Sequence, residues 1–210
     1  MSDESVSDAP RLRLARPEDA AAVRDIYAPF VRETPATFTL EPPSVSDLRE
    51  KIRTTREGDA YPWFVAEEPS AGDRTASETD AEGGGSILGY AYATPVRDRP
   101  AYQWSVETSI YVDPTHHRGG VGRRLYDRLF DTLRRQGYVS AYAVLGLPNP
   151  ESEAFHEAYG FDHLADFPAA GYKLGAWRDV GWYRLELRPP PESPDPPRPV
   201  SAVASESDEF

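Results

Sequence analysis

The stretch His116-His117-Arg118-Gly119-Gly120-Val121-Gly122-Arg123-Arg124 has glycine at three of four consecutive positions. It follows a strand-like run over 104–112 and precedes a helical run in which Leu125, Leu129 and Leu133 recur on one face. Glycine permits left-handed backbone angles and close approach of a ligand, while a helix start presents unpaired N–H groups and a partial positive charge. The stretch therefore predicts an anion cradle, with a plain glycine-rich connector as the alternative.

Several kinds of site are excluded by the residues present. No Gly-Lys-Ser/Thr follows the loop, so it is not a nucleotide P-loop, and it lacks the spacing of the dinucleotide-binding fingerprint. The chain contains no cysteine, which excludes a disulfide framework, a thiolate metal site and a cysteine nucleophile. The four histidines lack the spacing of metal ligands, so we expect no metal.

Strands and helices alternate on both sides of the loop. Ser44 is expected to begin a short helix and Gly137 to end the long one. This alternation predicts an α/β sandwich around one mixed sheet. The expected strands cover 12–14, 63–66, 87–92, 104–112, 141–145 and 182–187, and the expected helices cover 23–31, 44–52, 121–136 and 151–159.

The acidic residues are concentrated in three segments of low hydrophobicity. Segments 1–10, 67–86 and 189–210 carry the whole formal net charge of −12, so the rest of the 210-residue chain is balanced. Their composition predicts a disordered N-terminus, a disordered loop inserted between two strands, and a disordered proline-rich tail, around one domain over 11–188. We expect no nucleic-acid partner, no membrane association and a cytoplasmic location, since no apolar run is long enough to span a bilayer.

Several blocks, in order along the chain, resemble one enzyme family. The match to the GNAT superfamily of acetyl-CoA-dependent N-acetyltransferases lies in the glycine loop, where His117 replaces the usual Gln or Arg. The further blocks resemble its phosphinothricin N-acetyltransferase branch. They are Tyr61-Pro62-Trp63, Ala101-Tyr102-Gln103-Trp104, Glu107-Thr108-Ser109-Ile110-Tyr111-Val112, Gly146-Leu147-Pro148-Asn149, Phe155-His156-Glu157-Ala158-Tyr159-Gly160-Phe161 and Ala169-Ala170-Gly171-Tyr172-Lys173-Leu174-Gly175-Ala176-Trp177-Arg178-Asp179-Val180-Gly181.

The resemblance implies a fold, a reaction and an assembly. The fold is an α/β (α+β) GNAT-like three-layer sandwich, with a mixed central sheet of about six or seven strands flanked by about four helices. The reaction is direct transfer of acetyl from acetyl-CoA to the primary amine of phosphinothricin or an analogue such as methionine sulfone or sulfoximine. A homodimer is also implied. Two alternatives remain, namely a GNAT enzyme acting on another amine or a protein N-terminus, and a non-catalytic acyl-CoA-binding module.

Two residues are candidates for proton transfer. Glu107 stands among apolar neighbours in a strand, where desolvation is expected to raise its pKa, and its family counterpart is the general base. The alternative is an ordinary carboxylate on the polar face of the strand. His156 is expected on a short helix, as an acid for the departing thiolate or an aid to the base. Its alternative is a structural, hydrogen-bonded histidine.

The resemblance also assigns binding residues. Backbone groups of the strand would hold the pantetheine arm, and the glycine loop would hold the pyrophosphate. Phe38 would form an apolar wall for the acceptor, and arginines would pair with its anionic group, or else form an ordinary charged loop. The expected cofactor contacts are Ile110, Tyr111, Val112, Arg118, Gly119, Gly120, Val121, Gly122, Arg123 and Asn149, and the expected substrate contacts are Phe38, Arg97, Arg99 and Tyr102.

Overall fold

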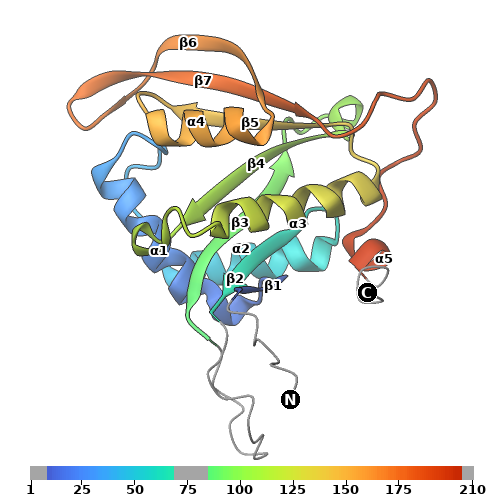
Figure 1. The fold of residues 1–210 in the computed structure, drawn as a ribbon, viewed down its shortest axis with the longest axis horizontal. Coiled ribbons are helices and arrows are strands. Elements are labelled where there is room, and N and C mark those ends of the chain that lie inside the picture. Colours follow the sequence, from blue (N-terminus) through green and yellow to red (C-terminus); the bar gives the residue numbers. More distant parts are fainter. Residues whose placement is uncertain (1–8, 69–84, 205–210) are drawn as a thin grey trace, which may run out of the picture.

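A computed structural model describes residues 9–68 and 85–204 of the chain. Within these residues, seven strands form one mixed sheet in the order β1-β2-β3-β4-β5-β7-β6 (Figure 1). All neighbouring strands are antiparallel except β4 and β5, which are parallel. The strands are β1 (Arg11–Leu14), β2 (Trp63–Glu67), β3 (Ile87–Pro95), β4 (Ser105–Val112), β5 (Ser140–Gly146), β6 (Asp162–Lys173) and β7 (Ala176–Glu186).

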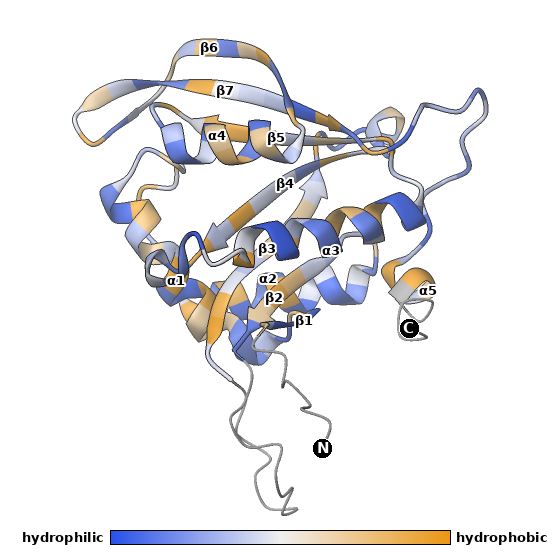
Figure 2. Cartoon of the chain, viewed as in Figure 1, coloured by the Kyte–Doolittle hydropathy of each residue, from blue (hydrophilic) through white to orange (hydrophobic). Residues whose placement is uncertain are grey.

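Helices cover both faces of this sheet, which confirms the predicted three-layer α/β sandwich. Helices α1 and α2 pack on one face through a core that includes Val23, Ile52 and Val65. Helix α3 packs on the other face through Leu125 and Leu129, and apolar and polar segments alternate along it in Figure 2. The helices are α1 (Ala20–Glu33), α2 (Val45–Gly58), α3 (Val121–Gln136), α4 (Pro150–Tyr159) and α5 (Val200–Ala204), with short 3₁₀ turns at η1 (Pro17–Asp19), η2 (Pro100–Tyr102) and η3 (Pro114–His116).

The helix boundaries expected from capping residues are confirmed. Ser44 accepts a hydrogen bond from the backbone N–H of Asp47, and the side chain of Asp47 returns to the N–H of Ser44. This reciprocal pair satisfies two N–H groups that the helix itself leaves free. Gly137 ends α3 with φ of 100°, a left-handed angle that glycine adopts without steric cost.

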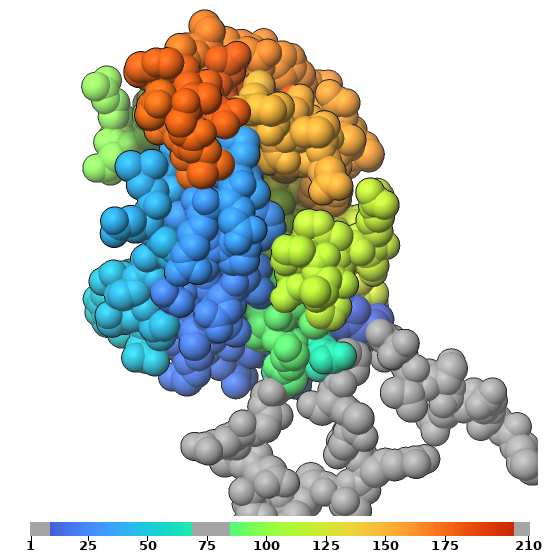
Figure 3. Space-filling model, turned by 90° about the vertical axis from the view of Figure 1, so that its left-hand side faces the viewer, coloured from blue at the N-terminus to red at the C-terminus, as the bar shows by residue number. Residues whose placement is uncertain are grey.

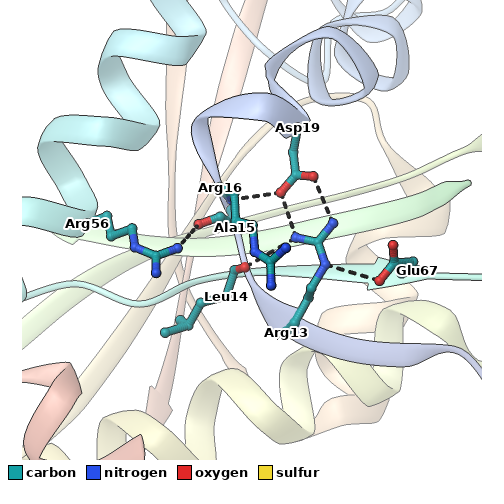
Figure 4. A network of polar contacts seen from close by, with 7 residues as sticks. All are labelled: Arg13, Leu14, Ala15, Arg16, Asp19, Arg56 and Glu67. Carbon is teal, nitrogen blue, oxygen red and sulfur yellow. Dashed lines mark hydrogen bonds and ion pairs between the residues drawn. The ribbon is translucent and has the colours of Figure 1, made fainter. Parts of the chain in front are cut away.

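The first strand is tied to the rest of the sheet by charged groups. Arg13 donates to both carboxylate oxygens of Asp19, at 2.7 and 2.8 Å, and its Nε donates to Glu67 at 3.1 Å (Figure 4). Glu67 was expected in the acidic loop, but it is buried at the end of β2, opposite Arg11. The ion pair with Arg13 compensates the burial of this carboxylate, which explains the longer strand. Residues 1–8 and 69–84 of the acidic segments lie outside the described residues.

The structure differs from the expected solvated tail over residues 189–204. Residues Val200 and Val203 of α5 are buried, and the N–H of Val200 donates to the carbonyl of Asp59 at 2.7 Å. Earlier in the tail, Trp104 Nε1 donates to the carbonyl of Asp195 at 2.8 Å. The prolines prevent pairing in a sheet, but they do not prevent docking through carbonyls and two valines. Residues 205–210 lie outside the description.

Strand β6 and the first half of β7 were absent from the sequence-based expectation. They form a long hairpin in which almost every β6 residue is exposed, so no alternation of apolar and polar residues marks the strand. Its pairing with β7 also shifts register twice, and Pro168 lies at the second shift, between Phe167 and Gly171. In Figure 3 the end of the hairpin, in orange, rests on the blue surface formed by α1 and the segment after it.

Candidate active site

The site is built around a fork between the two parallel strands. Strands β4 and β5 pair over only three positions, the last being Glu107 opposite Tyr142. Thr108 Oγ donates to the carbonyl of Tyr142 at 3.2 Å, at the point where the strands separate. Beyond it, β4 continues to Val112 paired with β3 alone, so the edge of β4 that faces β5 has backbone groups outside the sheet ladder. A fork of this kind offers backbone donors and acceptors to an extended ligand.

Glu107 lies at the base of this fork. Its side chain is half-buried, and burial raises the pKa of the carboxyl group, while the positive charge of Arg97 acts in the opposite direction. Because side chains alternate along a strand, Glu107 shares its sheet face with Ser109 and Tyr111, the face on which α1 and α2 pack. A carboxylate with a raised pKa beside an open fork is suited to accepting a proton near neutral pH.

Two of the expected substrate residues border the same region. The guanidinium of Arg97 lies 5.6 Å from the ring centre of Trp182, which pairs with Val144 of β5. Phe38 lies over Gly146, where an added Cβ would come within 3.2 Å of the Phe38 ring. Tyr142, Val144 and Gly146 alternate onto one face of β5, so Glu107, Arg97 and Phe38 surround a single face of that strand.

The other two expected substrate residues are Arg99 and Tyr102. Both belong to the turn around η2, in which the N–H of Arg99 donates to the carbonyl of Arg97 and the N–H of Tyr102 donates to the carbonyl of Arg99, each at 2.9 Å. Their side chains are exposed. The positive charge of Arg97 acts on Glu107, and no such effect of Arg99 or Tyr102 is found.

The glycine loop forms an open helix start. Arg118 and Gly120 adopt left-handed φ angles of 63° and 79°, and Gly120 is the N-cap of α3 without any side-chain cap. The first backbone N–H groups of α3 therefore have no partner from the helix or from a capping side chain. A Cβ added at Gly120 would meet nothing within 4 Å, so the space outside this residue is free. These features fit a phosphate-bearing ligand such as the pyrophosphate of coenzyme A.

The remaining expected cofactor residues flank the loop and the fork. Ile110 and Val112 face α3, and a Cβ at Gly122 would touch Ile110 and Phe155. Tyr111 points to the other face, with its ring 4.8 Å from that of Tyr27.

Asn149 is the N-cap of α4, and its N–H donates to Glu153. Arg123 is exposed and lies 5.6 Å from the ring of Tyr159, while buried Val121 anchors the start of α3.

His156, expected either to transfer a proton or to be a structural hydrogen-bonded residue, lies buried in the core with both ring nitrogens engaged. The residue is 2% exposed. Its Nδ1 is 2.7 Å from the carbonyl of Ser152, so Nδ1 carries the hydrogen, and its Nε2 accepts from the hydroxyl of Tyr126 at 2.8 Å. Burial lowers the pKa of His156 and the Ser152 carbonyl partly opposes this, so the imidazole is neutral at pH 7.

Tyr126 connects this histidine to the fork. Burial raises the pKa of Tyr126, and the nearby hydroxyl of Thr108 partly offsets the effect. A buried row of polar groups therefore runs from His156 through Tyr126 and Thr108 to the carbonyl of Tyr142. Sequence reasoning missed Tyr126 and Thr108, because neither carries a sign of its partners in the local pattern.

Comparison with known proteins identifies the family. The family model described as Acetyltransferase (GNAT) family matches residues 34–161 of this chain. The chain belongs to the GNAT family. A phosphinothricin N-acetyltransferase of Streptomyces viridochromogenes is 38% identical over 91% of this chain and 93% of the relative. An L-methionine sulfoximine/L-methionine sulfone acetyltransferase of Salmonella typhimurium is 31% identical over 84% of this chain and 94% of the relative.

A solved structure agrees with the observed fold of this GNAT chain. The crystal structure of a phosphinothricin acetyltransferase from Sinorhizobium meliloti, in complex with acetyl-CoA, matches with a TM-score of 0.76 at 30% identity. The match covers 91% of this chain and 98% of the other. Membership of the family makes this chain an acetyltransferase and confirms the resemblance noted in the sequence.

A cavity that the sequence did not predict lies beside the site in this GNAT domain. It has a volume of about 250 Å³ and lies between α2 and the face of β2 and β3. Its lining includes Trp63, Tyr90, Tyr92 and Lys51, but none of Glu107, Arg97 and Phe38. Tyr27 and Thr39 also line it, so the cavity reaches the segment that carries Phe38.

Two further features of this GNAT chain concern metals and membranes. Among residues 9–68 and 85–204, no group of three or more His, Asp or Glu side chains could hold a metal ion. In the same residues, no helix has both the length and the apolar character needed to cross a bilayer.

Proposed function

We propose that this enzyme transfers acetyl from acetyl-CoA to the primary amine of phosphinothricin or a related amino-acid analogue, such as methionine sulfoximine or sulfone. Two relatives that cover most of the chain, the phosphinothricin N-acetyltransferase and the L-methionine sulfoximine/L-methionine sulfone acetyltransferase, are named for these acceptors. The observation that carries the proposal is the half-buried carboxylate of Glu107 at the β4–β5 fork, with a raised pKa and with Arg97 and Phe38 around the same face.

Glu107 is proposed as the general base. An α-amine is mostly protonated near neutral pH, and only its free lone pair attacks a carbonyl carbon. Glu107 accepts the amine proton as the new N–C bond forms and the C–S bond breaks, and the sulfur leaves as a thiolate that then takes up a proton. The N–H groups of β4 along the open side of the fork stabilise the negative charge on the carbonyl oxygen. With no cysteine in the chain, direct transfer without an acyl-cysteine intermediate is favoured.

Acetyl-CoA supplies the thioester, and the residues to hold it are those expected from the sequence. Backbone N–H groups of the glycine loop and of the first turn of α3 would bind the pyrophosphate, and the open edge of β4 would bind the pantetheine amides. The open helix start and the unpaired strand edge both support this placement. The proposed set is Ile110, Tyr111, Val112, Arg118, Gly119, Gly120, Val121, Gly122, Arg123 and Asn149.

The acceptor is proposed to bind between Phe38 and Arg97. Arg97 is near enough to Glu107 to affect its pKa, so an anionic group held by Arg97 would place the amine close to the carboxylate. Phe38 supplies an apolar wall over β5. Arg99 and Tyr102, exposed on the same loop, are proposed to contact the outer end of the acceptor.

His156 is proposed as a positioning residue, in place of a direct acid. Its two ring nitrogens are engaged by Ser152 and Tyr126, and Tyr126 in turn contacts Thr108 at the fork. A neutral histidine in this position fixes the hydroxyl of Tyr126 and, through it, the side chain of Thr108.

We also infer a homodimer and a cytoplasmic location. The β6–β7 hairpin carries five exposed large apolar side chains, which are Leu164, Phe167, Tyr172, Leu174 and Trp177. A concentration of this kind is typical of an interface, and analytical ultracentrifugation of the wild type and of Trp177→Arg tests it. The cytoplasmic location follows from the use of acetyl-CoA, which is an intracellular metabolite.

The proposed reaction is tested by the release of free thiol from acetyl-CoA with a panel of acceptors. Release with phosphinothricin or methionine sulfoximine supports the proposal. Release only with peptides would select a protein N-terminal acetyltransferase, and release only with other amines would select a different small acceptor. Binding of coenzyme A without any release would show a non-catalytic module, and any of these three results would overturn the proposed acceptor.

A further inference from the structure

Lys173 is the one buried residue of strand β6. It is 5% exposed, whereas the other residues of that strand are exposed or half-buried. The chain has only one other lysine, Lys51, which is exposed on α2. Burying an ammonium group carries a desolvation cost, and burial lowers the pKa of Lys173 accordingly. A buried cation at the end of an exposed strand therefore calls for partners that compensate it.

Its partners belong to the segment that carries Phe38. Lys173 Nζ donates to the carbonyl of Thr37 at 2.6 Å and lies 3.5 Å from the carbonyl of Phe30. Phe30 is in the last turn of α1, where its carbonyl also accepts from the hydroxyl of Thr34 at 2.9 Å and where a positive charge is favourable. Thr37 lies directly before Phe38. Lys173 thus joins the β6–β7 hairpin to the end of α1 and to the α1–α2 segment.

Tyr27 of α1 also holds the segment that carries Phe38. The hydroxyl of Tyr27 contacts the hydroxyls of Thr37 and Thr39, at 2.8 and 2.9 Å. Phe38 stands between these two threonines, and its ring packs on Gly171, two residues before Lys173. A Cβ at Gly171 would collide with the Phe38 ring, so the close approach requires glycine at this position.

We propose that Lys173 is a positioning residue that holds the Thr37 carbonyl, and through it holds Phe38 against Gly146 of β5 and Gly171 of β6. Lys173 thereby fixes the apolar wall of the acceptor site. This inference rests on the proposed function, because the wall is that of the proposed acceptor site. The ammonium contacts no part of the glycine loop or of the fork that would hold coenzyme A. Its removal should therefore affect the acceptor and spare the cofactor.

The test compares Lys173→Met with Lys173→Arg and with the matched control Lys51→Met. With phosphinothricin as acceptor, Lys173→Met is expected to raise the acceptor KM by about fivefold to tenfold and to leave the KM for acetyl-CoA within about twofold. Lys173→Arg keeps a cation that donates to carbonyls and should recover part of the loss. Lys51→Met, which removes an exposed ammonium from the rings of Trp63 and Tyr92, should leave both constants unchanged.

A second readout separates this proposal from the proposed reaction. Amide hydrogen exchange over residues 34–40, measured without ligands, should be faster in Lys173→Met than in the wild type. Gly171→Ala should displace Phe38 and raise the acceptor KM without removing the ammonium, and Gly58→Ala, where a Cβ meets nothing within 4 Å, is its control. Unchanged exchange and an unchanged acceptor KM in Lys173→Met would overturn the role of Lys173. If exchange over residues 34–40 is faster in Lys173→Met than in the wild type, but the wild type acetylates no amine, only the proposed function is refuted.

Discussion

Glu107 and Tyr142 form the last residue pair shared by the parallel strands β4 and β5, so the candidate base stands where the sheet opens. Glu107→Gln keeps the size of the side chain but removes the basic oxygen. We expect kcat to fall by about 100-fold or more, with coenzyme A affinity unchanged, because the glycine loop is not altered. Thiol release and calorimetric titration with coenzyme A measure the two effects. Equal turnover in Glu107→Gln and wild type would exclude Glu107 as the base.

The raised pKa of Glu107 predicts an acid limb in the rate. A base must be deprotonated, so kcat/KM should increase with pH through the pKa of this carboxyl group, which burial places above its ordinary value of 4.5. Arg97 lowers that pKa, so Arg97→Gln should move the limb to higher pH. The pH profiles of wild type, Arg97→Gln and Arg99→Gln provide the comparison. We expect no movement for Arg99→Gln, and a limb that Arg97→Gln leaves in place would contradict the coupling.

The centre of the fold could be predicted because its signals are local. The strand-like run over 104–112, the glycines of 119–122 and the helical spacing of Leu125, Leu129 and Leu133 predict a strand, a turn and a helix, and the structure confirms them. Neither β6 nor α5 has such a signal. Strand β6 is exposed and irregular, and α5 is stable only through contacts such as that of Val200 with Asp59, which is distant in the chain.

The same distinction applies to the site. The position of Glu107 in a strand was predictable, but the fork beside it depends on how many residues β4 and β5 pair, which no local pattern encodes. The burial of His156 depends on Tyr126, thirty residues earlier in the chain. The link from Lys173 to Thr37 spans 136 residues, so even a correct assignment of both segments would not have predicted it.

The left-handed conformation of Gly120 predicts a defect in cofactor binding. A β-branched residue at φ of 79° is strained, and its side chain would occupy the space outside the first turn of α3. Gly120→Val should weaken coenzyme A binding by about tenfold or more. Titration calorimetry with coenzyme A, without any acceptor, measures this effect independently of catalysis. Gly58→Ala is the control that should bind normally, and normal binding by Gly120→Val would mean that the pyrophosphate lies elsewhere.

The buried, neutral His156 predicts a loss of stability in mild acid. Burial lowers the pKa of this imidazole in the folded state, so below the unfolded value of about 6.5 the unfolded chain binds the proton more readily. The stability that depends on the neutral form is complete above pH 6.5. It decreases as the pH falls toward the folded pKa, by at most about 1.4 kcal/mol per pH unit.

Denaturant unfolding at pH 7.5 and 5.5 separates this contribution from those of the exposed histidines. His156→Gln removes the titrating group but keeps an amide able to pair with Ser152 and Tyr126, so its stability should depend less on pH than that of the wild type. If His156→Gln lost as much stability as the wild type between the two pH values, the decrease would have to come from other groups. Protonation of His156 would then not destabilise the polar groups that lie between His156 and Thr108 at the β4–β5 fork.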